Sequence, residues 1–498
     1  MTTAYRELEA RFARHAAIGE AASMLHWDMS TMMPAGGSDA RAEQLAALKR
    51  VCHDILTAPE TADLIAAAGE GTALDGWQAA NLREMRRAWV HATALDGALV
   101  EAMARTCAAS EMAWRAARPA SDFAVVKPHL EAVLRLVREV GQAKGEHLGC
   151  SPYDALLDEY EPGGRAARID PVFDDLAAFL PGFIARALES QAARPAPLPL
   201  DGPFPVATQR ELALRLMQAL GFEFDHGRLD TSLHPFCGGV PDDVRITTRY
   251  DEADFSRTLM GVLHETGHAL YERGLPTAWR RQPVGSARGM SVHESQSLLI
   301  EMQVCRGRPF LEFATPLFRA AFGQDGPAWS AENLHRRAIR VERSVIRVDA
   351  DEVTYPAHVI LRYRLERALI AGDLAIADLP GAWNDGMKAL LGVVPPDDRR
   401  GCLQDIHWYD GAWGYFPTYT MGAMTAAQLF DATSRAVPEL PSAIRRGDFA
   451  PLLGWLRREV HGRASLLETD DLLTAATSRP LDPAVFKAHL ERRYISDL

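Results

Sequence analysis

Apolar residues recur at three- and four-residue steps along most of this chain, which is the pattern of helices with one buried face. The pattern predicts helical segments over residues 4–26, 39–69, 75–116 and 126–147. One short stretch, residues 242–250, is instead rich in valine, isoleucine and threonine, which favour extended backbone. We therefore expect a mostly α fold with a small β-sheet.

The most proline-rich part of the chain lies near residues 194–205, and it could be a linker between two domains. Helical patterning resumes directly on both sides of it. We therefore interpret it as a surface connection within one large helical domain that spans residues 1–498. The sequence has no internal repeat of fixed period and no block of like charges that would divide the chain further.

Composition and charge exclude several classes of partner. Of the 498 residues, 47% are hydrophobic and 24% are charged, as in globular proteins, and the formal net charge is −12. An acidic chain repels phosphate backbones, so we expect no nucleic acid partner. No uncharged stretch reaches the roughly 18 residues that cross a membrane, so we expect no membrane insertion.

Six cysteines are scattered along the chain without a C-x-x-C pair. This spacing fits neither a disulfide framework nor a thiolate zinc site. The first residues carry mixed charge and no apolar segment follows them, unlike a secretory signal. We therefore expect reduced thiols and a cytoplasmic protein.

The sharpest motif is His-Glu-Thr-Gly-His at residues 264–268, inside an apolar run. Histidines four residues apart lie one helical turn above each other, so His264 and His268 can bind one Zn²⁺. Glu265, next to the first histidine, can reach a water on the metal without being a ligand. Asp254 could cap the start of this helix.

Catalytic zinc requires a third protein ligand in addition to two histidines. Glu294 is the best candidate, because it lies at the start of another predicted helix and its carboxylate can approach the ion from a different side. Ser291 and Glu294 also match a capping box, in which the glutamate would satisfy the helix N-terminus instead. Glu272 lies one turn beyond His268 and is better interpreted as a carboxylate outside the ligand set. His293 faces away by one helical step and is a weaker ligand candidate.

A His-His-Glu zinc site is suited to the hydrolysis of peptide bonds. The ion polarises the scissile carbonyl and lowers the pKa of its water toward 7, while Glu265 moves the proton to the leaving amine. Co²⁺ or Mn²⁺ could occupy the same nitrogen and oxygen ligands. Nothing in the sequence suggests a serine or cysteine nucleophile, and no phosphate-binding loop with a lysine is present.

Several short motifs occur in the order seen in one peptidase family, at residues 234–236, 243–247, 264–268, 293–296, 346–351 and 401–408. With these motifs the chain resembles the thermostable, Taq-type metallocarboxypeptidases, a gluzincin family. The resemblance implies a neurolysin-like, mostly α fold with zinc at the bottom of a deep substrate groove, broad side-chain tolerance and a homodimer. It also implies His264, His268 and Glu294 as ligands and Glu265 as general base and acid.

A carboxypeptidase must bind the free carboxylate of its substrate, and the planar guanidinium of arginine is suited to this task. Arg347 and then Arg245 are the candidates. Arg347 could instead form an interior salt bridge with Asp349 or Asp351. Arg245 could form one with Asp243.

Three further polar residues are candidates for the substrate site. His407 and Tyr419 could donate hydrogen bonds to the oxyanion or to the peptide backbone. His234 lies in a turn flanked by proline and could line the groove. Each of the three could instead be a packed structural residue, and Asp405 could orient a histidine or cap a helix.

The sequence supports two other functions less well. A groove-type oligopeptidase would cut internal bonds with the same zinc chemistry and would not require a free substrate carboxylate. An inactive helical binding protein would have lost a metal ligand or the general base. The sequence instead keeps all four of these residues, namely His264, Glu265, His268 and Glu294. We therefore predict a cytoplasmic zinc carboxypeptidase whose substrates are peptides with a free C-terminus.

Overall fold

The protein is built of helices around one small sheet. The computed structural model describes residues 3–70 and 74–496, and within them it has 20 α-helices and three strands. The N-terminal helices are α1 (Thr3–Thr31), α2 (Ser38–Thr57), α3 (Pro59–Gly69), α4 (Gly76–Thr93), α5 (Gly97–Ala120), α6 (Phe123–Leu148), α7 (Pro152–Tyr160) and α8 (Ala166–Ala192). None of the described helices is both long and apolar enough to cross a bilayer.

The metal motifs lie in the middle of the chain, which also contains the strands. Its elements are α9 (Val206–Ala219), β1 (Gly227–Thr231), β2 (Phe236–Val240), β3 (Asp243–Thr248), α10 (Phe255–Gly274), α11 (Met290–Leu298), the π-helical η5 (Leu299–Cys305), α12 (Arg308–Phe322) and α13 (Ala331–Ala338). The C-terminal part contains α14 (Tyr355–Ala371), α15 (Leu379–Leu391), α16 (Pro417–Ala436), α17 (Leu440–Arg445), α18 (Ala450–Glu459), α19 (Thr469–Thr477) and α20 (Pro483–Glu491).

The predicted mostly α fold is confirmed, and the helices differ from the prediction mainly at two breaks. The segment predicted over 39–69 is divided at Ala58, whose ψ is 136°, and a proline then occupies the first position of α3. The segment predicted over 75–116 is divided at Asp96, whose carboxylate accepts a hydrogen bond from the Leu99 amide at 2.8 Å and caps α5. A proline at the first break and a capping carboxylate at the second start the new helices, and apolar periodicity reveals neither.

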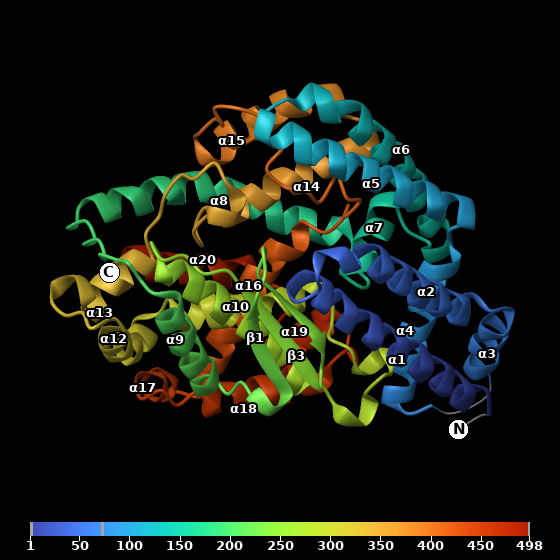
Figure 1. Cartoon of the computed structure of the whole chain (residues 1–498), viewed down its shortest axis with the longest axis horizontal. Helices are drawn as coiled ribbons and strands as arrows, with labels where there is room; N and C mark the ends of the chain where they lie inside the picture. The colour runs from blue at the N-terminus through green and yellow to red at the C-terminus, as the bar shows by residue number, and fades with distance from the viewer. Residues whose placement is uncertain (1–2, 71–73, 497–498) are drawn as a thin grey trace.

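Segments far apart in the sequence share the same regions of the molecule (Figure 1). Helices α5 and α6 share the top of the view with α14 and α15, and α1 to α4 form its lower right. Helices α9, α12, α13, α17 and α18 form the lower left, while α10 and α16 lie in the centre with the strands. The centre is therefore surrounded by helices from the N-terminal, middle and C-terminal parts of the chain.

The sheet has the strand order β1-β3-β2, with β1 parallel and β2 antiparallel to β3. The strand predicted near 242–250 is β3. Its alternate residues Val244 and Ile246 are buried in the same apolar core as Leu259 and Val262 of α10. This packing places the sheet against the helix that carries the histidine motif.

Two large apolar cores meet at α16. One core contains Met424 of this helix together with residues of α6, α8 and α14, and the other contains Ala426 together with the sheet and α10. Ala423 packs against both cores. Because α16 is held from two sides, it provides a fixed support for α11, against which it packs.

Residues 194–205 form the connection from α8 to α9, where a surface connection was predicted. The connection is held against α13 by Asn333. Its side-chain oxygen accepts a hydrogen bond from the Leu198 amide at 2.7 Å, and its nitrogen donates to the Leu198 carbonyl at 3.1 Å.

Candidate metal centre

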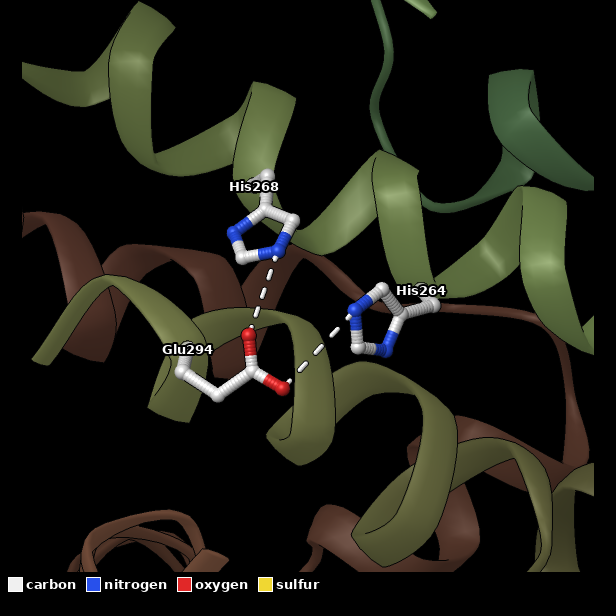
Figure 2. A group of neighbouring side chains, drawn as sticks. All are labelled: His264, His268 and Glu294. Atoms are coloured by element: carbon white, nitrogen blue, oxygen red, sulfur yellow. Dashed lines mark ion pairs between the residues drawn. The ribbon is translucent and has the colours of Figure 1, made fainter. Parts of the chain in front are cut away.

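His264 and His268 lie one turn apart on α10, a helix whose ends are set by its sequence. The carboxylate of Asp254 accepts hydrogen bonds from two backbone amides of the first turn, which confirms the predicted cap. Gly274 is the last residue of the helix. Both imidazoles turn toward the same point (Figure 2).

Glu294 of α11 directs its carboxylate at the two imidazoles (Figure 2). Its Oε1 lies 4.0 Å from Nε2 of His264, and its Oε2 lies 3.6 Å from Nε2 of His268. The alternative capping role is not observed, because Gly289 rather than Ser291 occupies the N-cap position of α11, and the Ser291 amide donates to Oε2 of Glu161 at 3.1 Å. The carboxylate of Glu294 is therefore available to the histidine pair.

Two glycines allow the helices of the site to approach one another closely. A Cβ on Gly267, between the two histidines, would lie 2.5 Å from the Gln296 carbonyl oxygen on α11. A Cβ on Gly422 of α16 would lie 2.8 Å from the Cβ of Glu294. A larger residue at either position would push α11 away from its place. The glycine of the motif at residues 264–268 is therefore part of the site's geometry.

The three side chains fit a divalent cation. The donor atoms of His264, His268 and Glu294 all lie within 4.8 Å of one another, close to the roughly 3.4 Å that separates two ligand atoms of a tetrahedral zinc ion. Imidazole nitrogen and carboxylate oxygen are ligand types that such ions favour. Burial raises the pKa of Glu294, against the opposing charge of His264. A bound cation would favour the ionised carboxylate here.

His264 is also held by a second carboxylate, that of Glu301 in η5. Its Nδ1 lies 2.9 Å from Oε2 of Glu301, and the other oxygen of Glu301 accepts a hydrogen bond from Arg306 at 2.7 Å. Burial by itself lowers the pKa of His264, but the bond with Glu301 and the charges of nearby carboxylates raise it to about 10. A cation that binds Nε2 of His264 therefore replaces a proton there, while Nδ1–H stays on Glu301.

His268 is oriented by a different chain of contacts. Its Nδ1 lies 2.7 Å from Nδ1 of His293, and Nε2 of His293 lies 2.8 Å from Oε1 of Glu272. The Glu272 carboxylate can only accept, so His293 donates through Nε2 and accepts through Nδ1. His268 then carries its proton on Nδ1 and directs an unprotonated Nε2 at Glu294. Burial holds the pKa of His268 well below its ordinary value, which keeps the ring neutral.

Glu265 follows His264 directly and is only 8% exposed. Burial raises the pKa of its carboxyl group to about 7, and the charge of His264 acts in the opposite direction. A carboxyl group that titrates near neutrality can both take up and release a proton under ordinary conditions.

His407 and Tyr419 are brought together, with Nε2 of the imidazole 3.2 Å from the phenol oxygen. Burial lowers the pKa of His407 to about 4 and raises that of Tyr419 well above its ordinary value, so both side chains are neutral near pH 7. Tyr419 lies one helical turn before Gly422 on α16, the position that packs against Glu294, and so its phenol is close to the metal ligands. A neutral phenol here can donate one hydrogen bond to a substrate oxygen.

Arg347 is buried, and its guanidinium is held on one edge. Nε and Nη2 both donate to Oδ1 of Asp405, at 3.1 and 2.8 Å, and Nη1 donates to the Tyr355 hydroxyl at 3.1 Å. The guanidinium carbon lies 4.9 Å from the centre of the Tyr419 ring. Among the described residues Arg347 thus uses three of its five donors, and it stacks on the ring of Tyr419.

The salt bridge of Arg347 involves neither of the partners that are close in sequence. Asp349 pairs with an arginine of α10, and Asp351 accepts hydrogen bonds from amides of its own loop. The partner is Asp405, which also accepts a hydrogen bond from Nε of Arg362 at 2.7 Å. Asp405 therefore orients two arginines rather than a histidine.

The other two substrate candidates lie apart from the metal ligands. Arg245 donates two hydrogen bonds to Asp243, at 3.0 and 2.7 Å, which is the alternative role that the sequence left open. Its guanidinium carbon stacks 4.2 Å from the ring centre of Trp27, while its neighbours along β3 are buried toward α10. His234 is exposed in the loop between β1 and β2. No described hydrogen bond or ion pair joins either residue to the metal ligands.

Three residues of this region had no motif that indicated them, namely Glu301, Tyr355 and Arg362. Glu301 lies two helical turns after Glu294, so helical spacing on the ligand helix could have identified it. Tyr355 and Arg362 could not be identified in this way, because both act through partners in other segments of the chain.

A family model and a curated relative match almost the whole chain. The model is described as the Carboxypeptidase Taq (M32) metallopeptidase, and it matches residues 7–494. Thermostable carboxypeptidase 1 of Thermus thermophilus is 40% identical over 480 residues, which cover 94% of each chain.

Solved structures show the same similarity in three dimensions. Trypanosoma cruzi metallocarboxypeptidase 1 has a TM-score of 0.96 and 42% identity, with 99% of this chain and 100% of that chain covered. The M32 carboxypeptidase from Deinococcus radiodurans R1 has a TM-score of 0.93 and 34% identity, with 99% of each chain covered. With a family model that matches residues 7–494 and relatives this similar over their full length, the chain belongs to the M32, Taq-type family of metallocarboxypeptidases.

Proposed function

We propose that His264, His268 and Glu294 bind a zinc ion, with which the protein removes single residues from the carboxyl end of peptides. The observation that carries this proposal is the convergence of two imidazole nitrogens and a carboxylate on one point. Zinc is the ion that this donor set favours in hydrolases, and Co²⁺ or Mn²⁺ could replace it. When bound, the ion polarises the scissile carbonyl and acidifies the attacking water.

Glu265 moves the proton in this proposal. It follows a metal ligand along α10 but is not part of the ligand set, so its carboxylate is free to accept a proton from the attacking water. The raised pKa of its carboxyl group, about 7, allows the proton to be held and then passed to the leaving amine. The reaction then needs no covalent intermediate.

We assign recognition of the substrate carboxylate to Arg347. It is buried beside Tyr419, and two of its five guanidinium donors have no partner among the described residues. Arg245 ranks behind it because its guanidinium lies on the side of the sheet away from α10, where it pairs with Asp243 and stacks on Trp27. His234, exposed in its loop, could contact the peptide only farther from the reacting bond.

Tyr419 and His407 complete the proposed site. The phenol of Tyr419 donates a hydrogen bond to the oxygen on which negative charge develops, and His407 orients that phenol from 3.2 Å. Both groups are neutral near pH 7, so neither adds a charge that would compete for the substrate carboxylate.

We propose one domain with a substrate groove that opens near His264, whose side chain is 21% exposed while that of Glu294 is 10% exposed. The resemblance to the family supports a homodimer, which light scattering would test. Six free cysteines are suited to the cytoplasm.

Product ladders from one long peptide test the proposed function directly. Mass spectrometry should show stepwise loss of single residues from the carboxyl end, and a chelator should abolish it. Restoring activity with Zn²⁺, Co²⁺ or Mn²⁺ in turn would rank the ions. Internal fragments as the first products, or activity that survives complete metal removal, would contradict the proposal.

Amidation of the peptide C-terminus separates this function from the oligopeptidase alternative. The amide has no carboxylate for Arg347, so a carboxypeptidase should lose most of its activity on it. An oligopeptidase that cuts internal bonds should cleave the acid and the amide at similar rates.

A further inference from the structure

Arg362 is a buried arginine that has no part in the proposed reaction. Its side chain on α14 is 0% exposed. Its guanidinium carbon lies 4.5 Å from the ring centre of Trp383 and 5.6 Å from that of Phe416. Burying a guanidinium costs free energy unless its charge is balanced, so the residues that balance it indicate what it does.

The partner of Arg362 is Asp405. Nε and Nη2 of Arg362 lie 2.7 and 2.6 Å from Oδ2 of Asp405, while Oδ1 accepts the two hydrogen bonds from Arg347. Nη1 of Arg362 donates to the carbonyl of His358 at 2.8 Å. One carboxylate therefore serves two guanidiniums, one on each oxygen.

Two guanidiniums and one carboxylate leave one positive charge unbalanced in a buried cluster. The charge of Arg347 also acts on Glu294, but in the proposed site that carboxylate would be balanced by the bound cation. The other neighbouring titratable groups do not change the balance. Burial lowers the pKa of His358 to about 3 and that of His407 to about 4, and it raises the pKa of Tyr355 and Tyr419, so all four are neutral near pH 7. Arg362 itself stays charged, because burial lowers its pKa only to about 10.

The unbalanced charge is accessible only at Arg347. Arg362 is enclosed by Trp383 and Phe416, whereas the side chain of Arg347 is 7% exposed and stacks on Tyr419 beside the metal ligands. An incoming carboxylate can therefore pair with Arg347 but not with Arg362.

We propose that Arg362 is a positioning residue for recognition of the substrate C-terminus: it balances Asp405 and so leaves the charge of Arg347 available to the peptide carboxylate. This inference rests on the proposed role of Arg347. Without Arg362, Asp405 and Arg347 would form a neutral pair, and the substrate carboxylate would approach a nearby carboxylate with no surplus positive charge to attract it.

The test uses one N-acetylated tripeptide in two forms, the free acid and the C-terminal amide. Titration calorimetry measures the binding of each form to the zinc-loaded Glu265→Gln protein, in which each further substitution is then made. Arg362→Met removes the charge and keeps much of the side chain's volume. It should weaken binding of the acid at least about tenfold and leave binding of the amide unchanged. Arg362→Lys keeps the charge and is the matched control, with acid binding close to that of the parent.

A double variant separates this charge effect from simple loss of packing. Arg362→Met combined with Asp405→Asn removes one positive and one negative charge, so the surplus on Arg347 returns. The double variant should bind the acid more tightly than Arg362→Met alone, although it carries one more substitution in the cluster. In steady-state assays of the active enzyme, Arg362→Met should raise KM for the acid and leave kcat within about threefold.

Two results would overturn the inference. One is acid binding by Arg362→Met that matches the parent, and the other is a double variant that binds the acid no better than Arg362→Met. If Arg362→Met does not fold, as its thermal melt would show, Arg362→Gln removes the same charge and is subject to the same two outcomes. Arg347→Met separates the role of Arg347 from that of Arg362. If this variant still binds the acid more tightly than the amide, Arg347 does not recognise the substrate carboxylate. If Arg347→Met loses the preference and the Arg362 variants keep it, only the role of Arg362 fails.

Discussion

The Nδ1 atoms of His268 and His293 lie 2.7 Å apart, and this contact sets which nitrogen of His268 faces Glu294. Glu272 receives the Nε2–H of His293 at 2.8 Å, so His293 has only an acceptor to offer at Nδ1. His268 must then donate through Nδ1. The ring is therefore prepared to bind a cation through Nε2 before any cation arrives.

Replacing His293 should weaken metal binding without removing a ligand. His293→Ala leaves Nδ1–H of His268 without its acceptor, and we expect about a 10- to 100-fold loss of zinc affinity. Competition with a chromogenic chelator measures this directly on the purified protein. His226→Ala, at an exposed position away from the site, is the control and should not change the affinity. Equal zinc affinity in His293→Ala and the parent would show that the contact does not orient His268.

Replacing Glu265 should separate metal binding from turnover. Glu265→Gln keeps the size of the side chain but cannot accept the proton of the attacking water, so kcat should fall about 10²- to 10⁴-fold. Zinc content, measured by atomic absorption, should stay the same. The exposed Glu252→Gln is the matched control. Unchanged turnover in Glu265→Gln would refute its role as the base.

Arg347 and Arg245 form a matched pair for testing carboxylate recognition. Each is paired with one aspartate and stacked on an aromatic ring, but only Arg347 lies beside Tyr419 and the metal ligands. Arg347→Met should lower kcat/KM on free-acid peptides about 30-fold or more, through the loss of a buried charge partner. Arg245→Met should change it less than about threefold. A larger loss of kcat/KM in Arg245→Met than in Arg347→Met would assign carboxylate recognition to Arg245.

Glu366 makes stability depend on pH. Its carboxylate is fully buried and accepts hydrogen bonds from Tyr153 and Trp408, each at 2.8 Å, and from the Gly414 amide at 2.9 Å. Burial raises its pKa to about 7, against the effect of these bonds. A raised pKa in the folded state favours the protonated form, so this contribution to stability is complete below about pH 4.5 and is lost as the pH rises through about 7.

Denaturant unfolding at pH 5, 6.5 and 8 measures this contribution. Between pH 5 and 8 the free energy of unfolding of the parent should fall by up to about 3 kcal/mol more than that of Glu366→Gln, which cannot ionise. The exposed Glu342→Gln should follow the parent. Parallel pH profiles for the parent and Glu366→Gln would show that Glu366 does not titrate in this range.

Local physics determined much of this protein from its sequence. Apolar periodicity predicted the helices, a β-branched stretch predicted β3, and a spacing of four placed His264 and His268 on one face of α10. These features depend on residues close to one another in the sequence, so local patterns predict them. The approach of Glu294 from a second helix could be predicted because an incomplete histidine pair requires a third ligand.

The tertiary structure decided the partners of the charged groups. Asp405 pairs with Arg347 and Arg362, which lie 58 and 43 positions away in the sequence. Asp349 and Asp351, which are close to Arg347 in the sequence, bind other groups. Likewise, only packing shows that Glu301 holds His264 and that His293 holds His268. Ion pairs form wherever buried charges meet, and that place is fixed by how helices pack rather than by distance along the chain.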